Sequence, residues 1–300
     1  MKNIDLSIIV VAFNSRETIL GCINSIFETV KSHSYEIIIS DNSEDDQTEE
    51  IVKRNFGDNE KVIYIHNDKN YGFSKGNNIA VRESSGEYIL FLNPDTKMYM
   101  NTVDGMIEFL KDHPDCGAAT CYMKLPDGKL DDASHRGFPT PVRALSHFSG
   151  FSKLFPKSKR FGGYNLTYLN LTKTHEIDAL AGSFMIMPRL VGDKLGWWDE
   201  DFFFYGEDID FCYRIKEAGY KIYFVPEHEA LHMKGVSSGI KKVSKDITKA
   251  SRKTKKLATY HRFRAMEIFY DKHYKNKYPF VVTGLVKVGI KVKKLVTSSR

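Results

Sequence analysis

The stretch Leu6–Ser15, LSIIVVAFNS, decides the fold of this chain. It is a continuous apolar run, rich in β-branched residues, that ends in the polar pair Asn14-Ser15. Such a run is typical of a central strand in a parallel sheet, because helices cover both faces of that strand. The run is too short to span a membrane, and Asp5 and Asn14 bracket it closely. The pattern therefore indicates a buried strand and not a signal peptide.

Helices and strands alternate along the chain after this first strand. We expect helices over 18–31, 49–55, 75–83 and 102–111, and strands over 35–40, 62–66, 88–92 and 118–122. This alternation with short connections predicts an α/β fold with a mostly parallel, doubly wound sheet. Ligands of such sheets bind in the crevice outside the carboxyl ends of the strands. Three predicted strands end there in Asn14, Asp41 and Asp95, so we expect a ligand site at this edge.

Composition excludes several classes of protein. Three hundred residues are enough for one large α/β domain with appendages. The net charge of +6 is modest, and no recognised nucleic-acid-binding module accompanies it, so we expect no nucleic-acid partner. The four cysteines form no CxxC pair and lie among apolar residues (Cys22, Cys116, Cys121 and Cys212). This usage predicts reduced, buried thiols in a cytoplasmic protein.

The two common phosphate-binding loops are missing. The turn after the first strand contains AFNSRET, and neither GxGxxG nor GxxxxGK[ST] occurs in the chain. This absence disfavours a dehydrogenase and a nucleotidyltransferase. A nucleotide on this sheet would need another device for its phosphates, such as a divalent cation. Asp95, in Asn93-Pro94-Asp95, is a candidate anchor for Mg²⁺ or Mn²⁺, although the same tripeptide also suits a simple turn.

Acidic residues gather at a second place, in GEDIDFC at a predicted helix start. Glu207 and Asp208 could simply favour the helix dipole. Their aromatic surroundings could instead raise a carboxyl pKa, as a general base requires. Asp210 and Arg214 are four residues apart, as in a structural pair on a helix. His232 is either structural or the nitrogen ligand that a metal at Asp95 would need.

The chain resembles family 2 glycosyltransferases with the GT-A fold, and most of all their rhamnosyltransferase-like members. The resemblance runs from Leu6 to Ser238 and rests on the ordered stretches SIIVVAFNS (7–15), ISDNSEDD (39–46), NYGFSKGNN (70–78), GEYILFLNPDT (86–96), ALAGSFMIMPR (179–189), GWWDEDFFFYGEDIDFCYRIKEAGY (196–220) and LHMKGVSS (231–238). Each stretch alone is weak evidence, whereas the ordered set is highly specific.

The resemblance implies roles for particular residues. Asp208 would be the catalytic base, and Asp95 and His232 would bind the divalent metal, Mn²⁺ or Mg²⁺. The nucleotide-sugar donor would contact Phe13, Asn14, Asp41, Gly72, Phe73, Asn77, Asn93 and Asp95, and the acceptor would contact Trp198, Asp199 and Glu207. One departure stands out: Asn93 replaces the first acid of the family's DxD motif, which leaves one carboxylate fewer for the metal.

The resemblance therefore implies an inverting, metal-dependent glycosyltransferase that acts in bacterial surface polysaccharide synthesis. The acceptor would be a hydroxyl of a glycan or of a polyprenyl-linked glycan. The NPD variant favours dTDP-L-rhamnose as the donor, ahead of a UDP-sugar such as UDP-galactose or UDP-glucose. Two alternatives stay open: a UDP-hexose-dependent enzyme of the same fold, and a non-catalytic nucleotide-sugar-binding protein.

We expect a catalytic domain over 1–238 and a basic helical extension over 239–300. The domain would divide into a nucleotide-binding half, 1–97, and an acceptor-binding half, 98–238, with a long loop at 126–174. In the extension, the cluster Lys241–Lys256 could meet lipid-linked phosphates or be solvated. As a helix, 280–296 would place Val281, Leu285, Val288, Val292 and Leu295 in one apolar stripe. That stripe could bind an anionic membrane or pack on the domain. We expect a cytoplasmic protein, peripheral at the inner face of the cell membrane.

Overall fold

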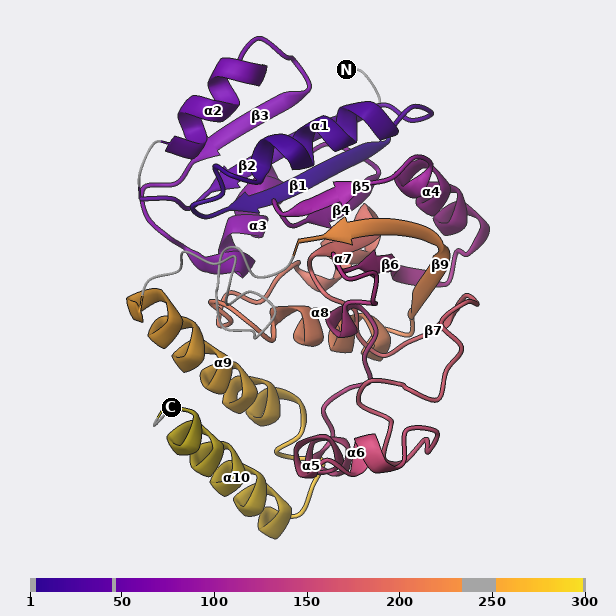
Figure 1. Cartoon of the computed structure of the whole chain (residues 1–300), viewed down its shortest axis with the longest axis vertical. Helices are drawn as coiled ribbons and strands as arrows, with labels where there is room; N and C mark the ends of the chain where they lie inside the picture. Colours follow the sequence, from indigo (N-terminus) through magenta and orange to yellow (C-terminus); the bar gives the residue numbers. More distant parts are fainter. Residues whose placement is uncertain (1–3, 45–46, 234–251, 299–300) are drawn as a thin grey trace.

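A computed structural model describes residues 4–44, 47–233 and 252–298 of the chain, and within them nine strands form one sheet. Figure 1 shows this sheet in the upper part of the molecule. The strands of its first half are all parallel, in the order β3 (Val62–His66), β2 (Tyr35–Asp41), β1 (Leu6–Ala12) and β4 (Tyr88–Leu92). This half is the predicted βαβαβαβ unit.

The second half of the sheet is mixed. β8 (Phe184–Pro188) runs antiparallel to β4 and joins it to β6 (Cys116–Lys124), which is parallel to β9 (Lys221–His232). Two short strands, β5 (Thr96–Met98) and β7 (His175–Glu176), pair with β9 and had no periodic signal in the sequence. The complete sheet is therefore mixed, and three of its parallel pairs lie in the half formed by β1 to β4.

Side chains of β1 alternate between two apolar cores. Leu6, Ile8 and Val10 pack with helices α1 (Ile19–Thr29) and α4 (Thr102–Asp112) on one face. Ile9 packs on the other face, which is covered by α3 (Gly72–Arg82), α7 (Arg189–Leu195) and α8 (Glu207–Glu217). Helix α2 (Gln47–Phe56) lies beside β3 (Figure 1). Because both faces are buried, the strands are continuous apolar runs.

Two expectations about local structure need correction. The segment 126–174 is not a featureless loop, since it contains a 3₁₀ turn (η1, Asp132–Ser134) and the helices α5 (Pro141–Ser149) and α6 (Phe151–Leu154). Thr140 caps α5 by accepting a hydrogen bond from the Arg143 amide, and Pro141 occupies its first turn. The sequence of 177–188 also suggests a pair of strands, but only its second part forms one, β8, and 177–183 is a connection.

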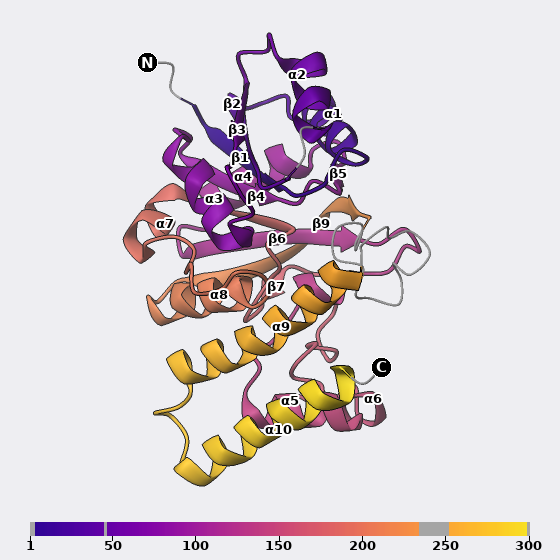
Figure 2. The same cartoon turned by 90° about the vertical axis from the view of Figure 1, so that its left-hand side faces the viewer.

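The C-terminal extension consists of the helices α9 (Arg252–His273) and α10 (Phe280–Ser298), so it is helical as expected, and α10 covers the stretch 280–296. Both views place α9 between α8 and α10 (Figures 1 and 2). An aromatic core joins α9 to α8 and the preceding loop (Phe202, Tyr213, Ala265, Phe269, Tyr270 and Tyr274). The predicted basic cluster is Lys241–Lys256, and its residues 241–251 lie outside the described residues.

Two further expectations concern helices and thiols. None of the helices in the described ranges is both long and apolar enough to cross a membrane. All four cysteines are buried and unpaired, as predicted. Burial raises the pKa of the Cys116 thiol to about 12, so it stays protonated and unreactive.

Candidate active site

The structure brings together Asp95 and His232, the two predicted metal ligands. Asp95 follows β4, and His232 is the last residue of β9. His232 Nε2 lies 3.3 Å from Asp95 Oδ1, and both side chains are 7% exposed. The Asn93 amide lies beside them, with Nδ2 3.5 Å from His232 Nε2.

A third residue, Asp131, completes this arrangement. Its carboxylate lies 2.8 Å from His232 Nδ1 and is fully buried. Burial alone would lower the pKa of His232, but the two carboxylates outweigh it and raise that pKa to about 9. The imidazole is therefore held between two acids, with Nε2 directed to Asp95 and Nδ1 to Asp131.

A divalent cation could bind between Asp95 and His232 only by displacing the Nε2 proton, because the raised pKa keeps the free imidazole protonated at neutral pH. Histidine ligands of metals usually pass their other ring N–H to a carboxylate, which fixes the tautomer, and Asp131 occupies that position. Across residues 4–44, 47–233 and 252–298, however, no group of three or more His, Cys, Asp or Glu side chains could hold a metal ion. Mg²⁺ and Mn²⁺ need few protein ligands when substrate phosphates supply the others. Asp95 and His232 would thus hold the ion jointly with a bound diphosphate.

The carboxyl end of β2 carries Asp41, whose side chain is fully buried. One carboxylate oxygen accepts hydrogen bonds from the amide and the hydroxyl of Ser43, at 2.9 and 2.5 Å, and the other accepts one from the Tyr64 hydroxyl. The backbone amide of Asn14 in turn donates a hydrogen bond to the Ser43 hydroxyl at 2.8 Å. In this structure Asp41 orders the loop where a nucleoside is predicted to bind.

Asn14 and Phe13 follow β1 at the same edge. Asn14 is exposed and has a φ of 52°, a left-handed conformation that asparagine tolerates better than most residues. Phe13 is half-buried beside it. Both side chains therefore border the edge of the sheet at which the predicted donor site lies.

Helix α3 begins at Gly72 next to this edge. Gly72 has a φ of 79°, and a Cβ at this position would collide with the carbonyl oxygen of Phe203. Only glycine fits this close approach of two backbones without strain. Asn77, by contrast, is 1% exposed and donates its amide hydrogen to the carbonyl of Phe73 inside the helix. The structure therefore places Gly72 at a contact with the 203 loop and Asn77 within the helix.

Asp208 lies in the first turn of α8 and forms an ion pair with Arg136. Arg136 Nη2 is 2.6 Å from Asp208 Oδ2, and the two side chains are 12% and 14% exposed. The other carboxylate oxygen accepts a hydrogen bond from the Ile209 amide at 2.8 Å. Arg136 comes from the segment 126–174 and also donates to the carbonyl of Leu180. The Asp208 carboxylate is thus fixed in place by the guanidinium of Arg136 and the Ile209 amide.

The carboxyl group of the preceding residue, Glu207, has a raised pKa. Burial and the nearby Asp208 charge raise the pKa of Glu207 to about 8. Its Oε2 atom is buried and has no hydrogen-bond partner among the residues that the structure describes. The raised carboxyl pKa expected in this aromatic stretch therefore belongs to Glu207, which is largely protonated at neutral pH.

A short stretch of backbone links the two acidic centres. Leu180 accepts the Arg136 bond, and the carbonyl of Ser183 accepts the Asn93 amide at 3.2 Å. Three Cα steps separate Leu180 from Ser183, a span of at most about 11 Å. The partner of Asp208 and the Asn93-Pro94-Asp95 turn are therefore anchored to opposite ends of one short connection.

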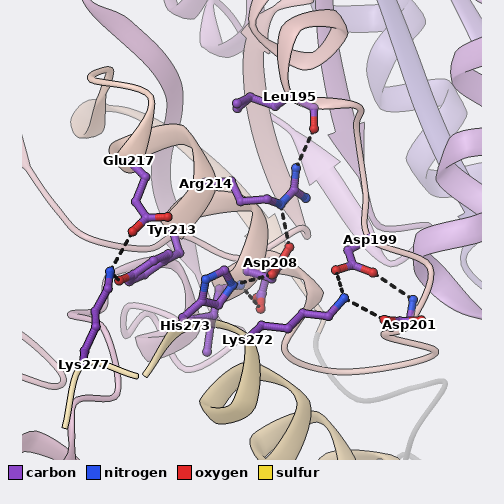
Figure 3. Close-up of polar contacts among 12 residues, drawn as sticks. Leu195, Asp199, Asp201, Asp208, Tyr213, Arg214, Glu217, Lys272, His273 and Lys277 are labelled. Carbon is purple, nitrogen blue, oxygen red and sulfur yellow. Dashed lines mark hydrogen bonds and ion pairs between the residues drawn. The ribbon is translucent and has the colours of Figure 1, made fainter. Parts of the chain in front are cut away.

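The predicted acceptor residues Trp198 and Asp199 are occupied by contacts within the protein. Trp198 is 2% exposed and packs against Phe73, Phe91 and Phe211 at ring-centre distances of 4.9 to 5.5 Å. This burial corrects the expectation that its ring flanks an acceptor. Figure 3 shows Asp199 paired with Lys272 of α9, which also lies 2.7 Å from Asp201.

Sequence reasoning missed Asp131 and Arg136. Both lie in the segment 126–174, where no helical or strand period marks individual positions. A metal-binding histidine does predict that some carboxylate supports its ring. Nothing in the spacing of the residues indicates which of the many acids in the chain does so.

Comparisons with known proteins identify the family of this chain. A family model described as Glycosyl transferase family 2 matches residues 7–186. The chain is 30% identical over 208 residues to Rhamnosyltransferase WbbL of Escherichia coli (strain K12), covering 66% of this chain and 72% of that protein. It is 24% identical over 212 residues to N-acetylglucosaminyl-diphospho-decaprenol L-rhamnosyltransferase of Mycobacterium tuberculosis (strain ATCC 25618 / H37Rv), covering 68% of each.

A solved structure supports the same fold. The chain superposes on the crystal structure of GalNAc-T7 with UDP, GalNAc and Mn²⁺ with a TM-score of 0.61 and 16% identity. The match covers 91% of this chain but only 49% of that one, so the present chain spans about half of its length. The sheet with helices on both faces, the family match and this superposition together identify a GT-A fold. The chain belongs to glycosyl transferase family 2 and is a glycosyltransferase.

Proposed function

We propose that this glycosyltransferase transfers L-rhamnose from dTDP-L-rhamnose, with inversion, to a hydroxyl of a polyprenyl-linked glycan. The observation that carries the proposal is the pair Asp95–His232, buried with its supporting Asp131 at the strand end where the fold binds nucleotides. The choice of rhamnose is supported by the Escherichia coli and Mycobacterium tuberculosis relatives, both of which are described as rhamnosyltransferases. The proposed lipid-linked acceptor has its parallel in the second relative's name.

Asp208 would act as the base. Its carboxylate has lone pairs beyond those used by Arg136 and the Ile209 amide, so it can accept the proton of an acceptor hydroxyl. The hydroxyl oxygen then forms a bond to the anomeric carbon as the bond from that carbon to the diphosphate oxygen breaks. Attack from the face opposite the diphosphate inverts the anomeric centre in one step, so a single base is enough.

Arg136 and Glu207 would set the charge around this base. The guanidinium of Arg136 fixes the orientation of the Asp208 carboxylate, while Glu207, largely neutral, adds little repulsion beside it. Positioning of this kind lowers the entropic cost of reaching the transition state.

Asp95 and His232 would bind Mn²⁺ or Mg²⁺ together with the donor diphosphate. When bound, the cation would offset the negative charge that develops on the leaving diphosphate. Asn93, in place of a carboxylate, lowers the negative charge of the site by one, so affinity for the cation would depend more on the donor. Phe13, Asn14, Gly72 and Phe73 would line the path of the nucleotide.

A lipid-linked acceptor requires that the enzyme work at a membrane surface. Nucleotide sugars are made in the cytoplasm, so we place the protein at the cytoplasmic face of the cell membrane. Glu207, which precedes the base in the chain, and Asp199 would contact the glycan acceptor.

The test is a donor screen followed by a transfer assay. dTDP-L-rhamnose, UDP-galactose, UDP-glucose and UDP-N-acetylglucosamine are compared for thermal stabilisation of the protein, each with and without Mn²⁺. We expect a Mn²⁺-dependent rise in melting temperature with dTDP-L-rhamnose alone, and transfer of rhamnose to a polyprenyl-diphosphate-linked sugar with an inverted anomeric centre. Stabilisation by a UDP-hexose instead would refute the rhamnose assignment, and binding of donors without turnover would refute catalysis.

A further inference from the structure

Helix α10 exposes its apolar stripe to solvent. The five residues that the sequence places in that stripe are between 53% and 68% exposed (Val281, Leu285, Val288, Val292 and Leu295). The opposite side of the helix faces the protein: Val286 packs against the aromatic core beneath α9, and the Thr283 hydroxyl lies 3.1 Å from that of Tyr270. The stripe is therefore not the surface by which α10 is attached to the domain.

Helices α5 and α6 expose a second apolar surface. It comprises Val142, Leu145, Phe148, Phe151, Leu154 and Phe155, which are between 47% and 70% exposed. Both views show these helices beside α10, at the end of the molecule farthest from β3 (Figures 1 and 2). Lys293 of α10 lies over the Phe148 ring, 3.0 Å from its centre. The two surfaces are thus neighbours, although more than 120 residues separate them in the sequence.

Together these surfaces hold most of the exposed apolar side chains of the described chain. Nineteen large hydrophobic residues are exposed in the described part of the chain, and thirteen of them belong to α10 or to the stretch 142–155. Scattered single hydrophobic residues are normal on a protein surface, whereas a contiguous group marks a site of interaction. We call this group of thirteen residues the apolar end face.

The two stretches of chain that carry the apolar end face contain charged residues of one sign only. The stretches 141–161 and 280–298 contain nine lysines and arginines and no aspartate or glutamate (Arg143, Lys153, Lys157, Lys159, Arg160, Lys287, Lys291, Lys293 and Lys294). Arg143 and Lys287 are neutralised by Asp178 and Asp271. A second copy of this chain would present the same positive charge, so self-association through this face is disfavoured. The complementary partner is apolar inside and negatively charged at its surface.

We propose that the apolar end face docks the enzyme on an anionic lipid bilayer. Helix α10, of 19 residues, would lie in the plane of the interface over about 28 Å, with its stripe among the acyl chains and its lysines at the headgroups. Helices α5 and α6 would insert Leu145 and Leu154 beside it. No helix of the described ranges can cross the bilayer, which is consistent with attachment to one leaflet.

This inference deepens the proposed function, on which its biological meaning rests, because a docked enzyme meets a lipid-linked acceptor in the same plane. Helices α5 and α6 belong to the segment that also supplies Arg136, the partner of Asp208. The docking surface and the residue that orients the proposed base are thus parts of one segment, 126–174.

Co-sedimentation with lipid vesicles tests the proposal. The full chain is mixed with vesicles of phosphatidylcholine alone or of phosphatidylcholine with phosphatidylglycerol. We expect binding to the anionic vesicles, a lower affinity at high salt, and little binding to the neutral ones. Absence of binding to the anionic vesicles, or equal binding to both kinds, would overturn the proposal.

Two double variants and one single control variant locate the surface. Leu285→Ser with Leu295→Ser removes two α10 contacts, and Leu145→Ser with Leu154→Ser removes two on α5 and α6; each pair should weaken binding at least about tenfold. Leu190→Ser is the matched control, because Leu190 is 63% exposed on α7 outside the apolar end face, and it should leave binding unchanged. If only the α10 pair weakens binding, the joint surface is wrong.

Two control measurements separate this proposal from its rivals. Light scattering of the wild type and both pairs in the absence of lipid should give a monomer throughout, and a dimer that the variants dissociate would mean that the face binds a second copy. Stabilisation by donor nucleotide should be the same in all variants. Loss of docking with intact donor binding supports the proposed surface, whereas an enzyme that docks but accepts no donor sugar would contradict the proposed function only.

Discussion

Replacement of Asp208 by Asn tests the proposed base most directly. The change keeps the size of the side chain and removes its negative charge and its ability to accept a proton. Loss of a general base typically lowers the turnover number 10²–10⁴-fold, or about 2.7–5.4 kcal/mol of transition-state stabilisation. Donor affinity should be nearly unchanged, because the contacts of Asp208 described above are with Arg136 and Ile209.

The same substitution should also destabilise the fold. Arg136 is 12% exposed and would lose its only carboxylate contact in the described structure. Removing one partner of a buried ion pair costs about 3–5 kcal/mol. We expect a value near the lower end, about 3 kcal/mol, because Arg136 keeps its hydrogen bond to the carbonyl of Leu180.

A second substitution separates the two effects. Arg136→Met in the Asp208→Asn background removes the unpaired charge, so most of the lost stability should return while turnover stays low. The assays are urea unfolding for stability, single-turnover transfer for catalysis and calorimetry for donor binding. Recovery of turnover in the double variant would mean that Asp208 is a structural residue. A main defect in nucleotide affinity would equally refute its role as the base.

Three other perturbations follow from the same structure. Glu207→Gln should stabilise the protein increasingly as pH rises from about 4.5 towards 8, because burial disfavours the charged form of Glu207 in the folded state and glutamine carries no charge. The gain in the free energy of unfolding at pH 7 is up to about 3 kcal/mol. Melting temperatures of variant and wild type against pH are the measurement. An unchanged gap between variant and wild type across that range would contradict the burial argument. Asp131→Asn should weaken Mn²⁺-dependent donor binding about 10–100-fold, because the imidazole of His232 loses the carboxylate that orients it, and calorimetry with and without Mn²⁺ is the check. Equal weakening without metal would point to misfolding. His273→Ala should loosen α9 from α8 at a cost of about 2 kcal/mol or more, since Asp210 is buried and bonded to His273 Nε2 at 2.7 Å. Native-state hydrogen exchange of the α9 amides measures this loss of local stability. Lys275→Ala, at an exposed neighbour, is the control.

The parallel half of the sheet was predictable because each strand carries its own signal. The runs that became β1, β2 and β4 are buried on both faces, so nearly every position is apolar and the run ends where the backbone reaches the edge. Asn14, Asp41 and Asp95 were found for the same reason, since polar residues directly after such runs lie at one edge. The amphipathic period of α10 was visible as well.

The partners of these residues were decided by tertiary structure alone. Asp131 and Arg136 come from a segment without period, and they reach His232 and Asp208 only because that segment folds back over the sheet. Trp198 had an aromatic and polar sequence environment that suited a binding site, yet packing among three other rings buries it. Whether the stripe of α10 faces the protein or the solvent was equally open, because a helical period defines two faces but does not say which one the rest of the chain covers. Local sequence determines how each element divides its polar and apolar sides, whereas only the assembled fold determines which of those sides meet.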